Sequence, residues 1–193
     1  AEVGRLFPNA KDYLDVYESH GLNTAQATFA HGIHLSESER QRLVNAGAKV
    51  AFCPSSNLFL GSGLLDMAAL PADNLSIASD VGGGTGLSML HTCAEGYKIA
   101  QLQNQSFHPL HAFYAITAGN AKTLSLDGQI GQLQPGLMAD LVVLNPTKPT
   151  GLDERFRSCE NLTEELFALM MLSDDRSVER CYIAGRLAYG ATG

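Results

Sequence analysis

A carboxylate followed closely by three glycines is the most distinctive chemical feature of the sequence. Asp80 comes just after the apolar run 75–78, and Gly82–Gly84 begin two residues later. A buried carboxylate is costly unless it is paired, hydrogen-bonded or bound to a metal. Consecutive glycines cost backbone entropy and are kept where a chain turns sharply or closely approaches a ligand. Two such costs at one point indicate a functional site.

Polar side chains also end two earlier apolar runs, at the tips of two expected strands. His31 lies at the end of the first run, and the segment 53–57 follows the second. In barrels and open α/β sheets, active sites form at the carboxyl ends of parallel strands. A neutral imidazole and a carboxylate both suit zinc, whose catalytic sites usually have three protein ligands and one water. His31 and Asp80 would therefore supply at most half of such a site.

Each candidate residue also has a structural interpretation. His31 could be a core histidine bonded to backbone, and Asp80 could be the N-cap of the helix that follows it. A cysteine on a buried strand, such as Cys53, is usually a small hydrophobe and not a nucleophile. The glycines match neither the GxGxxG pattern nor a P-loop with its Lys, which disfavours phosphate binding. The remaining histidines are expected to be at the surface or structural: His20, His34, His91, His108 and His111.

The elements that carry these residues follow from alternating helix and strand patterns. Strands are expected over 27–32, 49–54 and 75–80, with helices over 11–21, 35–47, 87–104 and 108–124. Ser36 and Glu39 have the spacing of a capping box at the start of the second helix. The polar residues 55–57 are expected to form a turn. Buried strands that alternate with helices imply the α/β class and a parallel sheet, open or closed.

The pattern changes from Gly128 onward. The segment 128–146 has closely spaced glycines and a strand over 139–145 that is rich in β-branched residues. Residues 178–190 predict two strands joined by a tight turn at Ala184–Gly185, and a helix is expected over 160–172. We therefore predict two domains, residues 1–125 and residues 126–193, of which the second is rich in strands.

The bulk composition bounds the class of protein. The 193 residues carry a formal net charge of −7, which argues against nucleic acid or an anionic membrane as partner. No apolar run approaches membrane-spanning length, and the start has no signal-peptide pattern. The four cysteines are scattered without a CxxC pair, which favours reduced thiols and a cytoplasmic location. The missing initiator Met leads us to expect a chain that lacks its natural beginning.

Three segments in this order and spacing resemble the amidohydrolase superfamily. They are AHGIHLS (30–36), FCPSSNLFLGSG (52–63) and ASDVGGGTGLSML (78–90), and GQIGQLQPGLMADLVVLNP also fits. Within the superfamily, the SDVGGG loop and DDRSV resemble the guanine deaminases. The resemblance implies that residues 1–125 are the C-terminal part of a (β/α)₈ TIM-like metallo-dependent hydrolase barrel, starting at its sixth strand. Residues 126–193 would form part of a small β-sandwich.

The same resemblance implies an activity and the roles of two residues. The family hydrolyses guanine to xanthine and ammonia with one zinc ion per active site, Fe²⁺ being the alternative metal. By family resemblance, Asp80 is a catalytic residue that binds the zinc and takes a proton from its water, and His31 is a catalytic residue that polarises this water. The resemblance also leads us to expect a homodimer with a purine substrate. We further infer that the glycines let the backbone pass close to a flat purine.

Two alternatives stay open beside this reading. The family's His-x-His pair and its fifth-strand histidine are absent from the sequence, so we expect them to lie before residue 1 and residues 1–193 alone to be inactive. The first alternative is another amidohydrolase, such as a triazine chlorohydrolase or a different aminopurine deaminase. The second is a non-catalytic domain that serves in structure or assembly.

Overall fold

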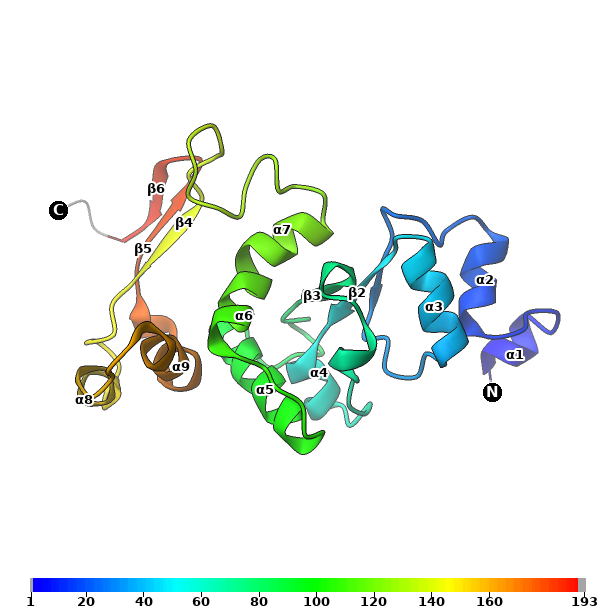
Figure 1. The fold of residues 1–193 in the computed structure, drawn as a ribbon, viewed down its shortest axis with the longest axis horizontal. Coiled ribbons are helices and arrows are strands. Elements are labelled where there is room, and N and C mark those ends of the chain that lie inside the picture. The colour runs from blue at the N-terminus through cyan, green and yellow to red at the C-terminus, as the bar shows by residue number, and fades with distance from the viewer. Residues whose placement is uncertain (1, 191–193) are drawn as a thin grey trace.

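Two three-stranded sheets organise the chain, of which the computed structural model describes residues 2–190. The first sheet is parallel, in the order β1 (Thr28–Ala30), β2 (Lys49–Phe52) and β3 (Leu75–Ile77). The second is antiparallel, in the order β4 (Leu141–Leu144), β5 (Val178–Ile183) and β6 (Arg186–Tyr189). The sheets lie apart along an elongated molecule, with the first helices at the end away from β4–β6 (Figure 1).

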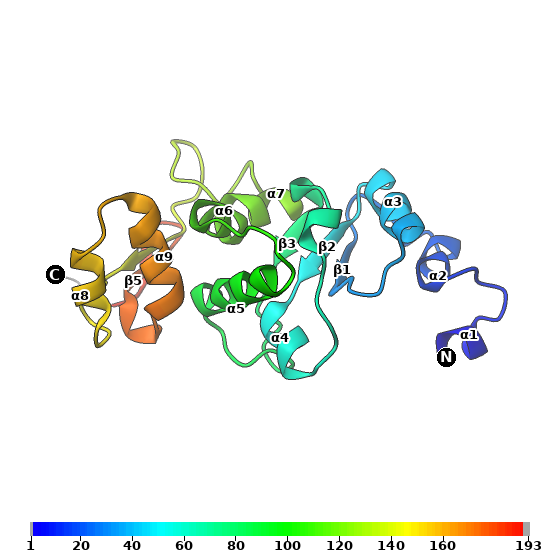
Figure 2. The ribbon, with the colours of Figure 1, turned by 60° about the horizontal axis from the view of Figure 1, so that its bottom comes forward.

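Helices of four to fourteen residues surround the two sheets. They are α1 (Glu2–Leu6), α2 (Tyr13–Ser19), α3 (Glu37–Asn45), α4 (Pro54–Phe59), α5 (Met89–Leu102), α6 (Pro109–Tyr114), α7 (Asn120–Thr123), α8 (Leu152–Arg157) and α9 (Leu162–Leu172). Helix α9 contacts α5, α6 and α8, so it joins the part around the parallel sheet to the part around the antiparallel one (Figure 2). Between residues 2 and 190, no helix is long and apolar enough to cross a membrane.

The predicted alternation of helices and parallel strands is confirmed in the region that holds the candidate residues. Helix α3 begins with the capping box, because Ser36 and Glu39 each bond to the other's backbone N–H. The sheet of β1–β3 is open, so the described residues form no closed barrel. The boundary between residues 125 and 126 stays a prediction.

Two local expectations were wrong. Residues 55–57 form part of helix α4 and not a turn, because Pro54 occupies the first helical position, where its missing N–H and fixed φ are tolerated. Strand β1 was expected to be buried, but Thr28 and Ala30 are exposed and Phe29 is only partly buried. It is one of the two edge strands of the sheet, so only its β2 side is covered by another strand.

The main hydrophobic core lies around β2, the central strand of the parallel sheet. Val50 and Phe52 are fully buried, and they pack in one cluster with Leu43 of α3 and Ile99 of α5. Strand β2 pairs with both β1 and β3, and its Val50 and Phe52 anchor it in the core. The ends of all three strands are therefore positioned by one well-packed central strand.

The C-terminal part confirms the predicted hairpin and adds a helix. Ala184 and Gly185 both have positive φ, of 49° and 76°, which suits a tight turn between β5 and β6. Helix α9 was predicted. Helix α8 was not, because the short sequence LDERFR carries a weak apolar pattern.

A side chain far along the sequence satisfies the outer edge of β3. The α6–α7 stretch is one continuous helical path with a π-helical turn at Ala115–Gly119, and this turn is followed by Asn120. The Oδ1 atom of Asn120 accepts from the Ile77 N–H at 2.9 Å, and its Nδ2 donates to the Ile77 carbonyl at 2.8 Å. One amide thus takes both hydrogen-bonding groups that β3 presents at this residue.

Asn120→Ala should destabilise the fold by about 1–3 kcal/mol, because it leaves a buried N–H and C=O of Ile77 without partners. The measurement is the midpoint of urea unfolding. Lys122→Ala on the same short helix is the control, since it removes only a surface ion pair with Asp73 and should move the midpoint little. Equal midpoints for the two variants would contradict the role given to Asn120.

Candidate active site

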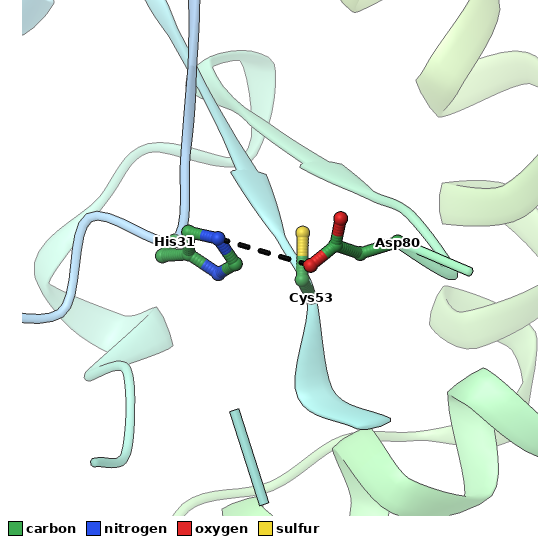
Figure 3. Close-up of side chains that lie close together, drawn as sticks. All are labelled: His31, Cys53 and Asp80. Carbon is green, nitrogen blue, oxygen red and sulfur yellow. Dashed lines mark ion pairs between the residues drawn. The ribbon is translucent and has the colours of Figure 1, made fainter. Parts of the chain in front are cut away.

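Three side chains converge where the parallel strands end. His31 directly follows β1, Cys53 directly follows β2, and Asp80 lies three residues beyond β3. Their potential ligand atoms all lie within 4.8 Å of one another. Figure 3 shows the three side chains turned toward a common point from their separate strands. The predicted meeting of His31 and Asp80 at this edge therefore occurs in the structure.

His31 and Asp80 face each other without a direct hydrogen bond. The Nε2 atom of His31 lies 3.8 Å from Oδ2 of Asp80, marked by the dashed line in Figure 3. This separation exceeds hydrogen-bond length. Each side chain is 39% exposed, so a small molecule or ion can reach both groups. His31 is therefore not a buried core histidine, and it forms no close ion pair with Asp80.

Both residues hold a backbone conformation that side chains rarely adopt. The φ angle is 68° at His31 and 48° at Asp80, in the left-handed region. Asp and His are among the residue types enriched there. Such conformations cost on the order of 1–3 kcal/mol and cluster at functional sites. Asp80 is also not a helix cap, since Ser88 is the N-cap of α5.

Cys53 is the neighbour that sequence reasoning set aside. The thiol is buried and donates to the Ala51 carbonyl at 3.4 Å. Burial, followed by the negative charge of Asp80, raises the pKa of Cys53 to about 11. At neutral pH the thiol stays protonated, which agrees with the prediction that Cys53 is not a nucleophile. Its proximity to the pair depends on strand register, which no local pattern in the sequence reveals.

Helix α4 adds polar side chains next to the site. They belong to residues 55–57, which were expected to form a turn. Asn57 is 1% exposed, and its Oδ1 lies 2.8 Å from Nδ1 of His31. Ser55 is also buried; its hydroxyl contacts that of Thr85 at 2.8 Å and accepts from the Thr85 N–H at 3.1 Å. One helix therefore holds both the imidazole and the glycine loop.

The glycines let the loop 81–86 fold tightly on itself and on α4. A side chain at Gly84 would collide with the Ser79 carbonyl oxygen, and one at Gly83 would lie 2.8 Å from the Ser56 hydroxyl. The Gly84 N–H also donates to the Asp80 carbonyl. The packing of the loop therefore explains why positions 83 and 84 are glycine, because a side chain would not fit at either one. The inference that the backbone passes close to a purine stays a prediction.

The other histidines have the structural environments that were expected. His20 caps the end of α2, and His108 is the N-cap of α6. His34 contacts the Ser62 carbonyl, His91 lies beside Glu95, and His111 packs on Phe107. All but His31 lie outside the convergence of strand ends, so His31 is the histidine that the fold brings to Asp80.

Comparison with known proteins assigns the family. The model of the amidohydrolase family matches residues 4–188 of this chain. The chain belongs to the amidohydrolase family. The match includes all three strand tips described above.

Relatives of this amidohydrolase include guanine deaminases. The chain is 43% identical to guanine deaminase of Escherichia coli K12 over 98% of its length, and it spans 44% of that relative. The solved structure of the E. coli guanine deaminase superposes with a TM-score of 0.94 at 41% identity, covering 98% of this chain and 45% of that one. An adenosine deaminase from Xanthomonas campestris with bound zinc shares the fold, with a TM-score of 0.80 at 23% identity over 98% of this chain and 43% of its own.

The donor set of the amidohydrolase site fits a zinc ion. An imidazole nitrogen and a carboxylate oxygen bind zinc at about 2.0–2.2 Å each. Their 3.8 Å separation is therefore short enough for one ion to contact both. Cys53 lies close by, but its protonated thiol is not a zinc ligand. Asp80 would bind the metal together with other ligands that complete its coordination, and His31 would lie beside it.

Replacing Gly84 by Ala should open the loop that carries Asp80. The added methyl group collides with backbone, a form of overpacking that costs roughly 1–3 kcal/mol, so hydrogen exchange of residues 79–88 should accelerate on the order of tenfold. Gly86→Ala is the matched control, because nothing lies within 4 Å of its added carbon. Hydrogen–deuterium exchange mass spectrometry measures both. Unchanged exchange in Gly84→Ala would refute the close packing of this loop.

Proposed function

We propose that this chain supplies part of the active site of a zinc-dependent guanine deaminase, which converts guanine and water to xanthine and ammonia. The observation that carries the proposal is the pairing of His31 with Asp80 at 3.8 Å in a chain 43% identical to a guanine deaminase. The chain spans about 44% of that relative, so the activity is proposed for the protein that includes it.

Asp80 is proposed as both a metal ligand and the proton acceptor. One carboxylate oxygen faces His31, and the side chain is accessible enough to meet water and substrate. The carboxylate takes a proton from the attacking water and passes it to the leaving amino group, which departs as ammonia. A positioned general base of this kind contributes roughly 10²–10⁴-fold to the rate.

His31 is proposed to hold and polarise the attacking water. Its Nε2 atom faces the Asp80 carboxylate, while its Nδ1 atom is hydrogen-bonded to Asn57. The ring therefore presents a single nitrogen to the reaction. Zinc, when bound, lowers the pKa of a water molecule to about 7, so that hydroxide is available at neutral pH.

Guanine is the proposed substrate because the relative that is 43% identical to this chain is a guanine deaminase. The test is release of xanthine and ammonia by the zinc-loaded complete protein, with adenine and a chlorotriazine as comparison substrates. Turnover of the triazine in place of guanine would favour the chlorohydrolase alternative. Absence of any hydrolysis by the zinc-loaded protein would favour a structural role. The cytoplasmic location and the homodimer stay predictions.

Asp80→Asn in the complete protein should lower guanine turnover by at least about 10²-fold, because it removes the charge and the proton acceptor. Asn tolerates the left-handed backbone at this position, so the fold should be retained. Ammonia release and circular dichroism measure the two effects. Asp127→Asn, at an exposed carboxylate, is the control and should behave like the parent. Near-normal turnover in Asp80→Asn would rule out this assignment.

His31→Ala should lower turnover by roughly 10²–10⁴-fold while much of the zinc stays bound, since His31 is proposed to act on the water more than on the metal. His31→Asn is the companion variant, because Asn fits the positive φ of 68° better than Ala. Zinc content by elemental analysis and ammonia release give the two readouts. Complete loss of zinc from both variants would make His31 a primary ligand, and His91→Ala on α5 controls for the loss of a histidine elsewhere.

A further inference from the structure

We propose that Asn57 is a positioning residue that fixes the tautomer of His31, with the proton on Nδ1 and the lone pair on Nε2. The effect on turnover rests on the proposed function, whereas the tautomer itself does not. Asn57 Oδ1 and His31 Nδ1 are 2.8 Å apart, across 26 residues of sequence. The amide is 1% exposed, so water does not compete for this hydrogen bond.

The tautomer follows from the chemistry of the two atoms. An amide oxygen only accepts hydrogen bonds, so the bond to Asn57 requires a proton on Nδ1. In a neutral imidazole the other nitrogen then carries the lone pair. That nitrogen, Nε2, faces Oδ2 of Asp80 at 3.8 Å. Had Nε2 carried the proton, a hydrogen bond of about 2.7–3.2 Å to the carboxylate would be expected.

Two acceptors facing one another are suited to a group that both can contact. The Nε2 lone pair and the Asp80 carboxylate can each accept a proton from water or bind a cation. With the proton moved to Nε2, the imidazole would instead donate a hydrogen bond to Oδ2 of Asp80. That oxygen would then be less available to water or a cation. Asn57 therefore keeps the accessible faces of His31 and Asp80 available together.

The burial of Asn57 is difficult to explain by stability. Its Nδ2 atom is buried without a hydrogen-bond partner in the described part of the chain. A buried donor left unsatisfied is costly, and an apolar residue of similar size would avoid that cost. The backbone of Asn57 is well held, because its N–H donates to the Cys53 carbonyl and its own carbonyl accepts from Ser62. The amide is thus held in place, with its oxygen bonded to the imidazole and its nitrogen without a partner.

The test compares Asn57→Leu with Asn57→Asp in the complete protein. Leu removes the acceptor, whereas Asp keeps one at the same position. In zinc-free protein labelled with ¹⁵N-histidine, at about pH 8, above the pKa of free histidine, NMR shifts of the ring nitrogens report which nitrogen of His31 is protonated. The His31→Asn spectrum assigns its signals. We expect the proton on Nδ1 in the parent and in Asn57→Asp, and substantial protonation of Nε2 in Asn57→Leu.

Turnover of guanine supplies the second readout. Asn57→Leu should lower kcat about 10–100-fold with little change in KM, as is typical when the partner that orients a site histidine is lost. Its melting temperature should stay equal to or above that of the parent. Asn74→Leu is the matched control, because Asn74 is a buried amide that donates to the Ala48 carbonyl away from the site. It should lose stability and leave the His31 tautomer unchanged.

Two results would overturn the proposal. One is a parent protein with the proton on Nε2 of His31, which would make Asn57 the donor. The other is an Asn57→Leu variant with the parent's tautomer. If the tautomer responds as expected while the parent itself fails to deaminate guanine, the positioning role stands and the proposed function falls.

Discussion

Hydrogen bonds from the central strand β2 to both of its neighbours hold the site together. The ladder continues one residue past each flanking strand, since His31 donates to the Ala51 carbonyl and Ala78 donates to the Phe52 carbonyl, both at 2.9 Å. Parallel pairing brings the carboxyl ends of all three strands to one level. A shift of one residue in the β1–β2 pairing would turn His31 to the opposite face of the sheet. The same shift in the β2–β3 pairing would turn the segment that leads to Asp80. The chemistry of the site thus depends on register.

The strain at the strand tips is balanced by the packing below them. His31 and Asp80 both have positive φ, and neither is a glycine. Helix α4 supports both tips, since Asn57 contacts the imidazole and Ser55 bonds to the loop that follows Asp80. Strand β2, whose Val50 and Phe52 are fully buried in the core, leads directly into α4. A rigid core therefore permits a backbone geometry that would be unfavourable in an isolated loop.

Much of this arrangement could be predicted from local sequence signals. The capping box at Ser36, the turn at Ala184–Gly185 and the meeting of His31 with Asp80 each follow from short-range spacing plus the rule that parallel strand ends share an edge. Helix α4 was missed because Pro54 resembles a terminator, although a proline at the first helical position is compatible with a helix. The contact of Asn57 with His31 and the exposure of edge strand β1 depend on tertiary pairing, which no local pattern encodes.

The amide of Asn120 also bears on how this chain can meet another copy of itself. Exposed strand edges act as templates for edge-to-edge pairing and aggregation. At Ile77 both backbone groups of β3 are already bonded to one side chain. An incoming strand finds neither donor nor acceptor at that residue, so intermolecular sheet extension along β3 is interrupted there. At this residue a side chain thus takes the place that a fourth strand would otherwise fill.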